Sequence, residues 1–219
     1  MVLTIEMARE WYPSADPVHG FDHVLRVYRL AEQIALAEGG NIEIVRAAVL
    51  LHDTQFDRQR LLDIQVSGSG AETPREDHHH VSAEFARQVL EREGWGEQDI
   101  EAVQHCIRAH RFRDDREQPQ TLEAKIVFDA DKLDAIGAIG VARAIAYAVS
   151  HGQPVYSPPS EDFLLSGELR PAEPHSSYHE YLFKLRYLKD RLFTRTGRAI
   201  AEDRHAFMQS YFENLVNEV

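Results

Sequence analysis

The chain has 219 residues, of which 43% are hydrophobic and 27% charged, a composition typical of a globular protein with its own core. Lysine and arginine number 24 against 36 aspartates and glutamates, so the formal net charge is −12. This balance argues against a general binder of nucleic-acid polymers, because such binding depends on neutralising phosphates. An acidic enzyme acting on phosphates would need a metal ion or a local basic pocket, since its average field repels the substrate.

The sequence also indicates where the protein works. It contains no run of about 18 apolar residues, so no transmembrane helix is expected, and its start lacks the basic and apolar regions of a signal peptide. Cys106 is the only cysteine, which excludes intramolecular disulfide bonds. We therefore expect a cytoplasmic protein that does not associate with membranes.

Apolar residues recur at helical spacing along most of the chain, while strand-like alternation is scarce. The pattern predicts an all-α fold. Helices are expected over residues 3–12, 21–38, 42–54, 78–93, 97–111, 121–150, 177–193 and 197–217, the sixth of them interrupted near Gly137 and Gly140.

The remaining stretches are rich in glycine, proline or charged residues and are expected to be irregular. They are 65–76, 112–120 and 152–176, the last with five prolines. We predict a helical core over residues 1–150. Residues 151–219 would form an irregular connection followed by two helices packed on that core.

His52 and Asp53 end the third expected helix. Ile42, Val45 and Val49 share a helical face with His52, so the imidazole should point toward the core. Burying an imidazole beside a carboxylate is costly unless both have partners, and a metal ion is one such partner. The alternative is a histidine that interacts with the helix dipole beside a solvated Asp53.

Two further helices carry residues of the same kind. His23 begins an apolar stripe that continues through Val27 and Leu30, so it should also approach the core. Asp131 and Asp134 project together from the 121–150 helix and have small or apolar neighbours. A solvated acidic face is the alternative for these aspartates. Together the three helices predict a metal site.

The order His23, His52-Asp53, Asp131 resembles the metal signature of the HD superfamily of phosphohydrolases. The stretches that carry this resemblance are HGFDHVLRV (19–27), AAVLLHD (47–53) and DADKLDAIGA (129–138). Residues 179–185 (HEYLFKL), 196–197 (TG) and 204–208 (RHAFM) are similar to the C-terminal part of a bacterial subgroup that hydrolyses small nucleotides. The resemblance covers nearly the whole chain.

The resemblance implies a single-domain helical bundle of the HD type with a C-terminal helical extension. It places one buried divalent ion on His23, His52, Asp53 and Asp131. Mn²⁺ or Mg²⁺ is typical of the subgroup, although two imidazoles also suit Ni²⁺, Fe²⁺ and Zn²⁺. A bound ion would acidify its water and polarise a phosphoryl oxygen.

Other residues are candidates for the reaction itself. Asp57 lies one helical turn after Asp53 and could orient or deprotonate the water; a solvated carboxylate is the alternative. Candidates for contact with the substrate are Arg26, His78, His110, Lys132 and Lys184. Each cation could also be a surface charge, and the two histidines match positions that complete a second metal site in larger relatives. A complete second ligand set is not found.

The leading hypothesis is metal-dependent hydrolysis of a phosphate ester or anhydride bond in a small nucleotide, with pyrophosphate release from a nucleoside triphosphate included. One alternative is a different enzyme on the same ligands, either a phosphodiesterase for cyclic or signalling nucleotides or an iron-dependent oxygenase. Another is a non-catalytic nucleotide-sensing module. The expected partner is a small nucleotide rather than a nucleic-acid polymer or a membrane, and the sequence leaves open whether the protein forms a homodimer.

Overall fold

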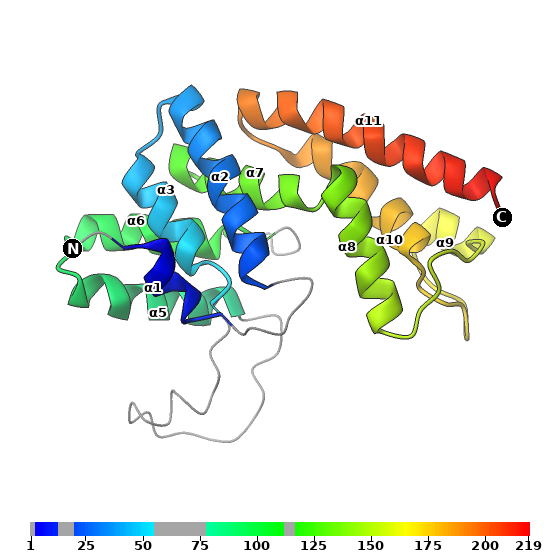
Figure 1. Cartoon of the computed structure of the whole chain (residues 1–219), viewed down its shortest axis with the longest axis horizontal. Helices are drawn as coiled ribbons and strands as arrows, with labels where there is room; N and C mark the ends of the chain where they lie inside the picture. Colours follow the sequence, from blue (N-terminus) through cyan, green and yellow to red (C-terminus); the bar gives the residue numbers. More distant parts are fainter. Residues whose placement is uncertain (1–2, 13–19, 55–77, 112–116) are drawn as a thin grey trace, which may run out of the picture. The chain divides into compact units, whose positions relative to one another are not determined.

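A computed structural model describes residues 3–12, 20–54, 78–111 and 117–219. These residues contain helices and no strand, so the predicted all-α fold is confirmed (Figure 1). The chain divides into two compact units, residues 1–130 and 131–219. The boundary falls within one continuous helix, α7 (Leu122–Asp134). The proposed helical core over residues 1–150 stays a prediction.

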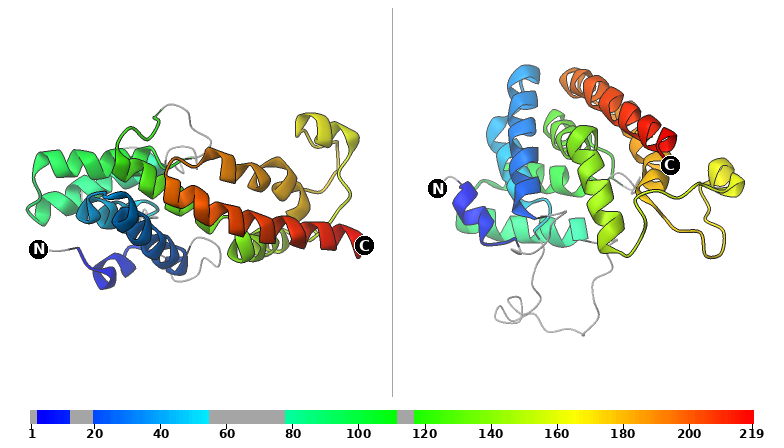
Figure 2. Two further views of the ribbon diagram at one scale, coloured as in Figure 1. Left: turned by 90° about the horizontal axis from the view of Figure 1, so that it is seen from above. Right: turned by 45° about the vertical axis from the view of Figure 1, so that its right-hand side comes forward.

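The first unit is built around α3. Besides the first part of α7, its helices are α1 (Ile5–Arg9), α2 (Phe21–Glu38), α3 (Ile42–Leu51), α5 (His78–Arg92) and α6 (Glu97–Arg108). Helix α3 contacts α1, α2, α5 and α6, and α5 lies along α6 (Figure 2). Such a central helix has little exposed surface, and residues 47–51 are at most 2% exposed. His52, the first residue after α3, is therefore held in the core of this unit.

Local signals explain where these helices begin and end. Gly39 ends α2 in the left-handed region, with φ of 81°. Asn41 caps α3 by accepting hydrogen bonds from the main-chain N–H groups of Glu43 and Ile44. Gly40 packs closely against α7, because a Cβ there would lie 2.5 Å from the Cδ1 atom of Ile126 and that side chain would have to move. The connection between α2 and α3 therefore contacts α7.

The second unit contains α8 (Gly137–Ser150), α9 (Glu161–Ser166), α10 (Ser177–Phe183), the 3₁₀ helix η1 (Leu185–Arg191) and α11 (Arg195–Asn217). Helix α8 contacts α10 and α11, and α11 also contacts η1. The predicted interruption near Gly137 is present, because α7 and α8 are separate helices bent by 64°. Among the described helices none alone has the length and hydropathy of a membrane span, although this bent pair reaches both when taken together.

Two expectations for the second unit were wrong. The stretch 152–176 is not wholly irregular, because α9 forms within it between a Ser160 cap and Gly167 at φ of 77°. Phe163 anchors this short helix against the ring of His179, with centroids 4.5 Å apart. The helix expected over 177–193 ends at Phe183, because Lys184 leaves the helical region at φ of −131° and ψ of −55°. The chain then continues as η1.

Candidate metal centre

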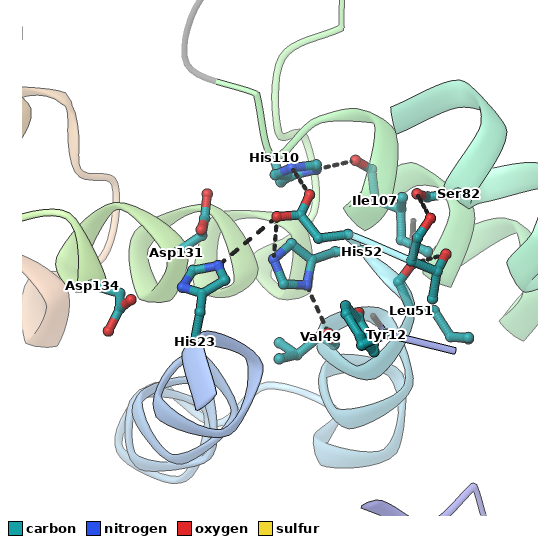
Figure 3. Close-up of polar contacts among 12 residues, drawn as sticks. Tyr12, His23, Val49, Leu51, His52, Ser82, Ile107, His110, Asp131 and Asp134 are labelled. Atoms are coloured by element: carbon teal, nitrogen blue, oxygen red, sulfur yellow. Dashed lines mark hydrogen bonds and ion pairs between the residues drawn. The ribbon is translucent and has the colours of Figure 1, made fainter. Parts of the chain in front are cut away.

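The end of α3 is closed by side chains. Each of its last three carbonyls, in residues 49–51, accepts a hydrogen bond from a side chain. Figure 3 shows the bond between His52 and Val49. The donors are His52 Nδ1 at 2.7 Å, the hydroxyl of Tyr12 at 3.1 Å and Thr54 Oγ1 at 3.2 Å. A helix normally leaves these carbonyls without a partner of its own. The expected helix over 42–54 therefore stops at Leu51, and the turn that follows is fixed.

These contacts also decide how two histidines present their rings. His52 Nδ1 bonds to the carbonyl of Val49, and His110 Nδ1 bonds to the carbonyl of Ile107. A carbonyl only accepts hydrogen bonds, so each Nδ1 carries the hydrogen and each neutral ring offers its Nε2 lone pair. Metal-binding histidines are typically oriented in this way.

Three imidazoles, those of the residues labelled His23, His52 and His110 in Figure 3, lie around the carboxylate of Asp53. The Nε2 atoms of His23, His52 and His110 lie 3.9, 3.7 and 3.6 Å from its oxygens. The three histidines are at most 4% exposed, and the Asp53 side chain is 19% exposed. The cluster therefore joins residues from α2, from the end of α3 and from the end of α6 beneath a largely closed surface.

Asp131 approaches this cluster on α7. It follows Ala130 within one continuous helix, so the part of α7 in the first unit fixes its position. The ligand atoms that His23, His52 and Asp131 can offer all lie within 4.8 Å of one another. The carboxylate of Asp131 also forms an ion pair with Lys132 at 2.6 Å.

This donor set fits a divalent ion. Ligand atoms at about 2.1 Å from one ion lie at most about 4.2 Å apart, so a closure of under about 1 Å would complete the geometry. Two neutral imidazoles suit several divalent metals, and the carboxylates of Asp53 and Asp131 would balance a charge of +2. The described residues therefore present a group that can hold a metal.

The structure brings some of the other predicted residues near the cluster and leaves others aside. His110 contacts Asp53, and Lys132 contacts Asp131. Arg26 is half-buried on α2, one turn after His23. Lys184, in the second unit, forms a 3.1 Å ion pair with Glu180. Asp57 and the side chain of His78 lie outside the described residues, and the roles expected for all of them stay predictions.

Sequence reasoning missed one buried residue next to the centre, Tyr12. Tyr12 is 7% exposed, and its pKa is raised by burial and then by the negative charge of Asp53. The phenol is therefore held protonated as a donor. Tyr12 is one residue from Pro13 and follows no helical period, so the pattern gave no signal for it.

An all-α fold in which two buried histidines meet a half-buried aspartate defines a class of helical proteins that can bind a metal ion. The sequence model of the HD domain matches residues 20–136, which is more than half of the chain. The chain belongs to the HD domain family, and the resemblance seen in its motifs is confirmed.

Several relatives support this assignment. The chain is 32% identical to the Bacillus subtilis protein YpgQ over 221 residues, covering 98% of this chain and 93% of that protein. A crystal structure of YpgQ in complex with ADP superposes with a TM-score of 0.69, covering 99% of this chain and 98% of that one at 30% identity. An HD-superfamily hydrolase from Bacillus thuringiensis gives a TM-score of 0.66 at 28% identity, with coverage of 98% and 95%. The chain thus has the fold of the HD-superfamily hydrolases.

A more distant relative shares only part of this chain. The chain is 33% identical to Ribonuclease Y from Chloroflexus aurantiacus over 111 residues, which is 51% of this chain and 17% of that protein.

Proposed function

We propose that this protein is a metal-dependent phosphohydrolase that cleaves a phosphate ester or anhydride bond of a small nucleotide. The observation that carries the proposal is the convergence of ligand atoms from His23, His52 and Asp131 within 4.8 Å, beside the carboxylate of Asp53. A nucleotide is favoured as the ligand because YpgQ, similar over nearly the whole chain, has been crystallised with ADP.

In this proposal His23, His52, Asp53 and Asp131 hold one divalent ion, Mn²⁺ or Mg²⁺ in preference to Ni²⁺, Fe²⁺ or Zn²⁺. Such an ion lowers the pKa of water and polarises a phosphoryl oxygen when it is bound. The chain itself orients the ligands. The carbonyl of Val49 accepts a hydrogen bond from Nδ1 of His52 and so directs Nε2 of His52 toward Asp53.

The remaining groups bind substrate or handle a proton. Lys132 and Arg26 would place positive charge beside the substrate phosphates in a chain whose net charge is −12. His110 offers Nε2 beside Asp53 and can contact a phosphate oxygen when it is protonated. We assign Lys184 and His78 to the substrate as well, and Asp57 to the water, on the strength of the sequence motifs.

The relatives suggest one competing substrate. The likeness to Ribonuclease Y over 111 residues favours a phosphodiester as the second candidate, either in RNA or in a signalling nucleotide. The overall acidity of the chain argues against a long polyanion. Small nucleotides therefore remain the leading class.

A substrate panel tests the proposal. Metal-stripped protein would be reloaded with Mn²⁺ or Mg²⁺ and offered nucleoside mono-, di- and triphosphates, a cyclic dinucleotide and a short RNA, with phosphate and pyrophosphate measured separately. We expect hydrolysis of a mononucleotide class. Asp53→Asn should lower the rate at least about a hundredfold, because even outer partners of metal ligands contribute about 10- to 100-fold.

The control variant is Asp22→Asn, an exposed aspartate in the first turn of α2 and next to His23. It should keep the wild-type rate. Demonstrated metal binding without turnover of any substrate would refute the proposal. Cleavage of RNA or of the cyclic dinucleotide alone would replace it with the phosphodiesterase reading.

A further inference from the structure

Negative charge is concentrated where α7 ends. Asp129, Asp131 and Asp134 occupy its last two turns, at the end where the helix dipole is itself negative. Asp129 is fully buried and Asp134 is 1% exposed. Burying carboxylates at this end of a helix is costly unless cations are placed against them. The final turn of α7 therefore depends on groups from outside the helix.

Two arginines of the second unit meet this turn. Arg143 on α8 donates from Nη1 to the Asp134 carboxylate at 2.8 Å and to the Asp134 main-chain carbonyl at 3.3 Å. Arg204 on α11 donates from Nη1 to the main-chain carbonyl of Leu133. A helix end leaves such carbonyls without a donor inside the helix, and the carbonyl of Leu133 also accepts from the main-chain N–H of Ile136 at 3.4 Å. Both arginines thus add side-chain donors at the end of α7, one from 9 and the other from 71 residues along the sequence.

The backbone around Arg204 is fitted closely to this contact. Gly137, the first residue of α8, has φ of 78°, and a Cβ there would lie 3.0 Å from the Cβ of Arg204. A Cβ on Gly140 would lie 2.3 Å from the carbonyl oxygen of Ala135. Glycine at 137 therefore lets the corner between α7 and α8 pack closely against α11, and glycine at 140 lets α8 lie close to the main chain of Ala135. Arg204 is half-buried, so its guanidinium is held within this corner.

We infer that Arg204 is a positioning residue for the metal centre: by binding the carbonyl of Leu133 it holds the turn of α7 that presents Asp131. The inference rests on the proposed function, in which Asp131 is a metal ligand. Asp131 lies two residues before Leu133, within the same helical turn. The ion pair of Arg143 with Asp134 supports that turn from α8. The C-terminal helices thereby acquire a role in metal binding.

The alternative is that Arg204 only stabilises the second unit. Arg198 provides a control that distinguishes this alternative from the positioning role. It lies on the same helix as Arg204 and donates to the main-chain carbonyl of Leu192 at 2.8 Å. Its acceptor lies at the end of η1 and not on α7. Arg198→Met therefore removes a comparable hydrogen bond without touching the turn that carries Asp131.

The test measures Mn²⁺ affinity of metal-stripped, full-length protein by isothermal titration calorimetry, together with its thermal midpoint before metal is added. We expect Arg204→Met to weaken Mn²⁺ binding about tenfold or more, as loss of an outer partner commonly does. Arg198→Met should lower the midpoint comparably and leave the affinity unchanged. Arg204→Lys retains a donor and should restore part of the affinity; it also serves if the methionine variant does not fold.

A double-mutant cycle decides whether the effect passes through Asp131. In an Asp131→Asn background, Arg204→Met should cause no further loss of affinity. Equal affinities of Arg204→Met and wild type, or equal losses for the Arg204 and Arg198 variants, would overturn the inference. If Asp131→Asn alone leaves Mn²⁺ affinity unchanged, the proposed ligand set fails instead, so the two failures are distinguishable.

Discussion

Removing the hydroxyl of Tyr12 should destabilise the end of α3. This hydroxyl donates to the carbonyl of Leu50, two residues before His52, at 3.1 Å. Tyr12 is 7% exposed and Leu50 is 1% exposed, so water cannot easily replace the bond. Tyr12→Phe keeps the ring and removes only the donor. The variant therefore isolates one hydrogen bond next to the centre.

The expected loss follows from the burial of both groups. A net hydrogen bond contributes about 0.5–1.5 kcal/mol, and a buried acceptor left without its donor costs about 1–3 kcal/mol. We expect a loss of about 1–2 kcal/mol in the free energy of unfolding. For a chain of this length that lowers the thermal midpoint by about 2–8 °C. Because burial and the charge of Asp53 raise the pKa of Tyr12, the loss should be the same at neutral and mildly alkaline pH.

Urea denaturation of the metal-stripped protein measures this loss, as the shift of the midpoint at constant slope. Tyr147→Phe is the control, because Tyr147 is 38% exposed and its ring stacks on His151 with centroids 4.0 Å apart. A change below about 0.5 kcal/mol, equal to that of a surface substitution, would refute the reasoning. It would mean that the carbonyl of Leu50 finds another donor at no cost.

Three further predictions concern stability. Hydrogen bonds from the main chain of Arg170 and from other donors lower the pKa of Glu173 to about 2, so an unfolded chain takes up this proton at higher pH than the folded one. The ionised Glu173 carboxylate therefore stabilises the folded chain fully above about pH 5, and this stabilisation is lost as the pH falls toward 2. The difference in thermal midpoint between wild type and Glu173→Gln should shrink over that range. The difference between wild type and the exposed control Glu168→Gln should stay near zero. Gly137→Ala should lower the midpoint more than Gly152→Ala, because both glycines have positive φ but only the first Cβ meets a neighbour, at 3.0 Å; equal shifts would contradict this. Adding Mn²⁺ at 100 times its dissociation constant should stabilise the protein by about 2.7 kcal/mol, and a midpoint that does not respond to metal would contradict the proposed centre.

The inward position of the metal-site histidines could be predicted because each continues an apolar helical stripe. His52 follows the face of Val49, and His23 precedes that of Val27; these residues are at most 2% exposed in the fold. Periodicity reports which way a side chain points. The family resemblance then supplied what periodicity lacks, namely which separate helices contribute to one site.

Contacts made by residues distant in sequence could not be predicted in this way. The hydrogen bond of Tyr12 to Leu50 spans 38 residues, and that of Arg204 to Leu133 spans 71. Helical periodicity shows which face of a helix is buried, but it does not indicate which distant residue Tyr12 or Arg204 contacts. Helix α9 was missed for a related reason: six residues are too few for a periodic pattern, and the burial of Phe163 against His179 stabilises it.

The central claim is that one divalent ion binds at His23, His52, Asp53 and Asp131. An anomalous difference map from crystals of the full chain grown with Mn²⁺ tests it most directly. The account predicts a single strong peak within about 2.0–2.3 Å of an imidazole nitrogen from each histidine and a carboxylate oxygen from each aspartate. A peak held by other side chains, with none among these four, would contradict it.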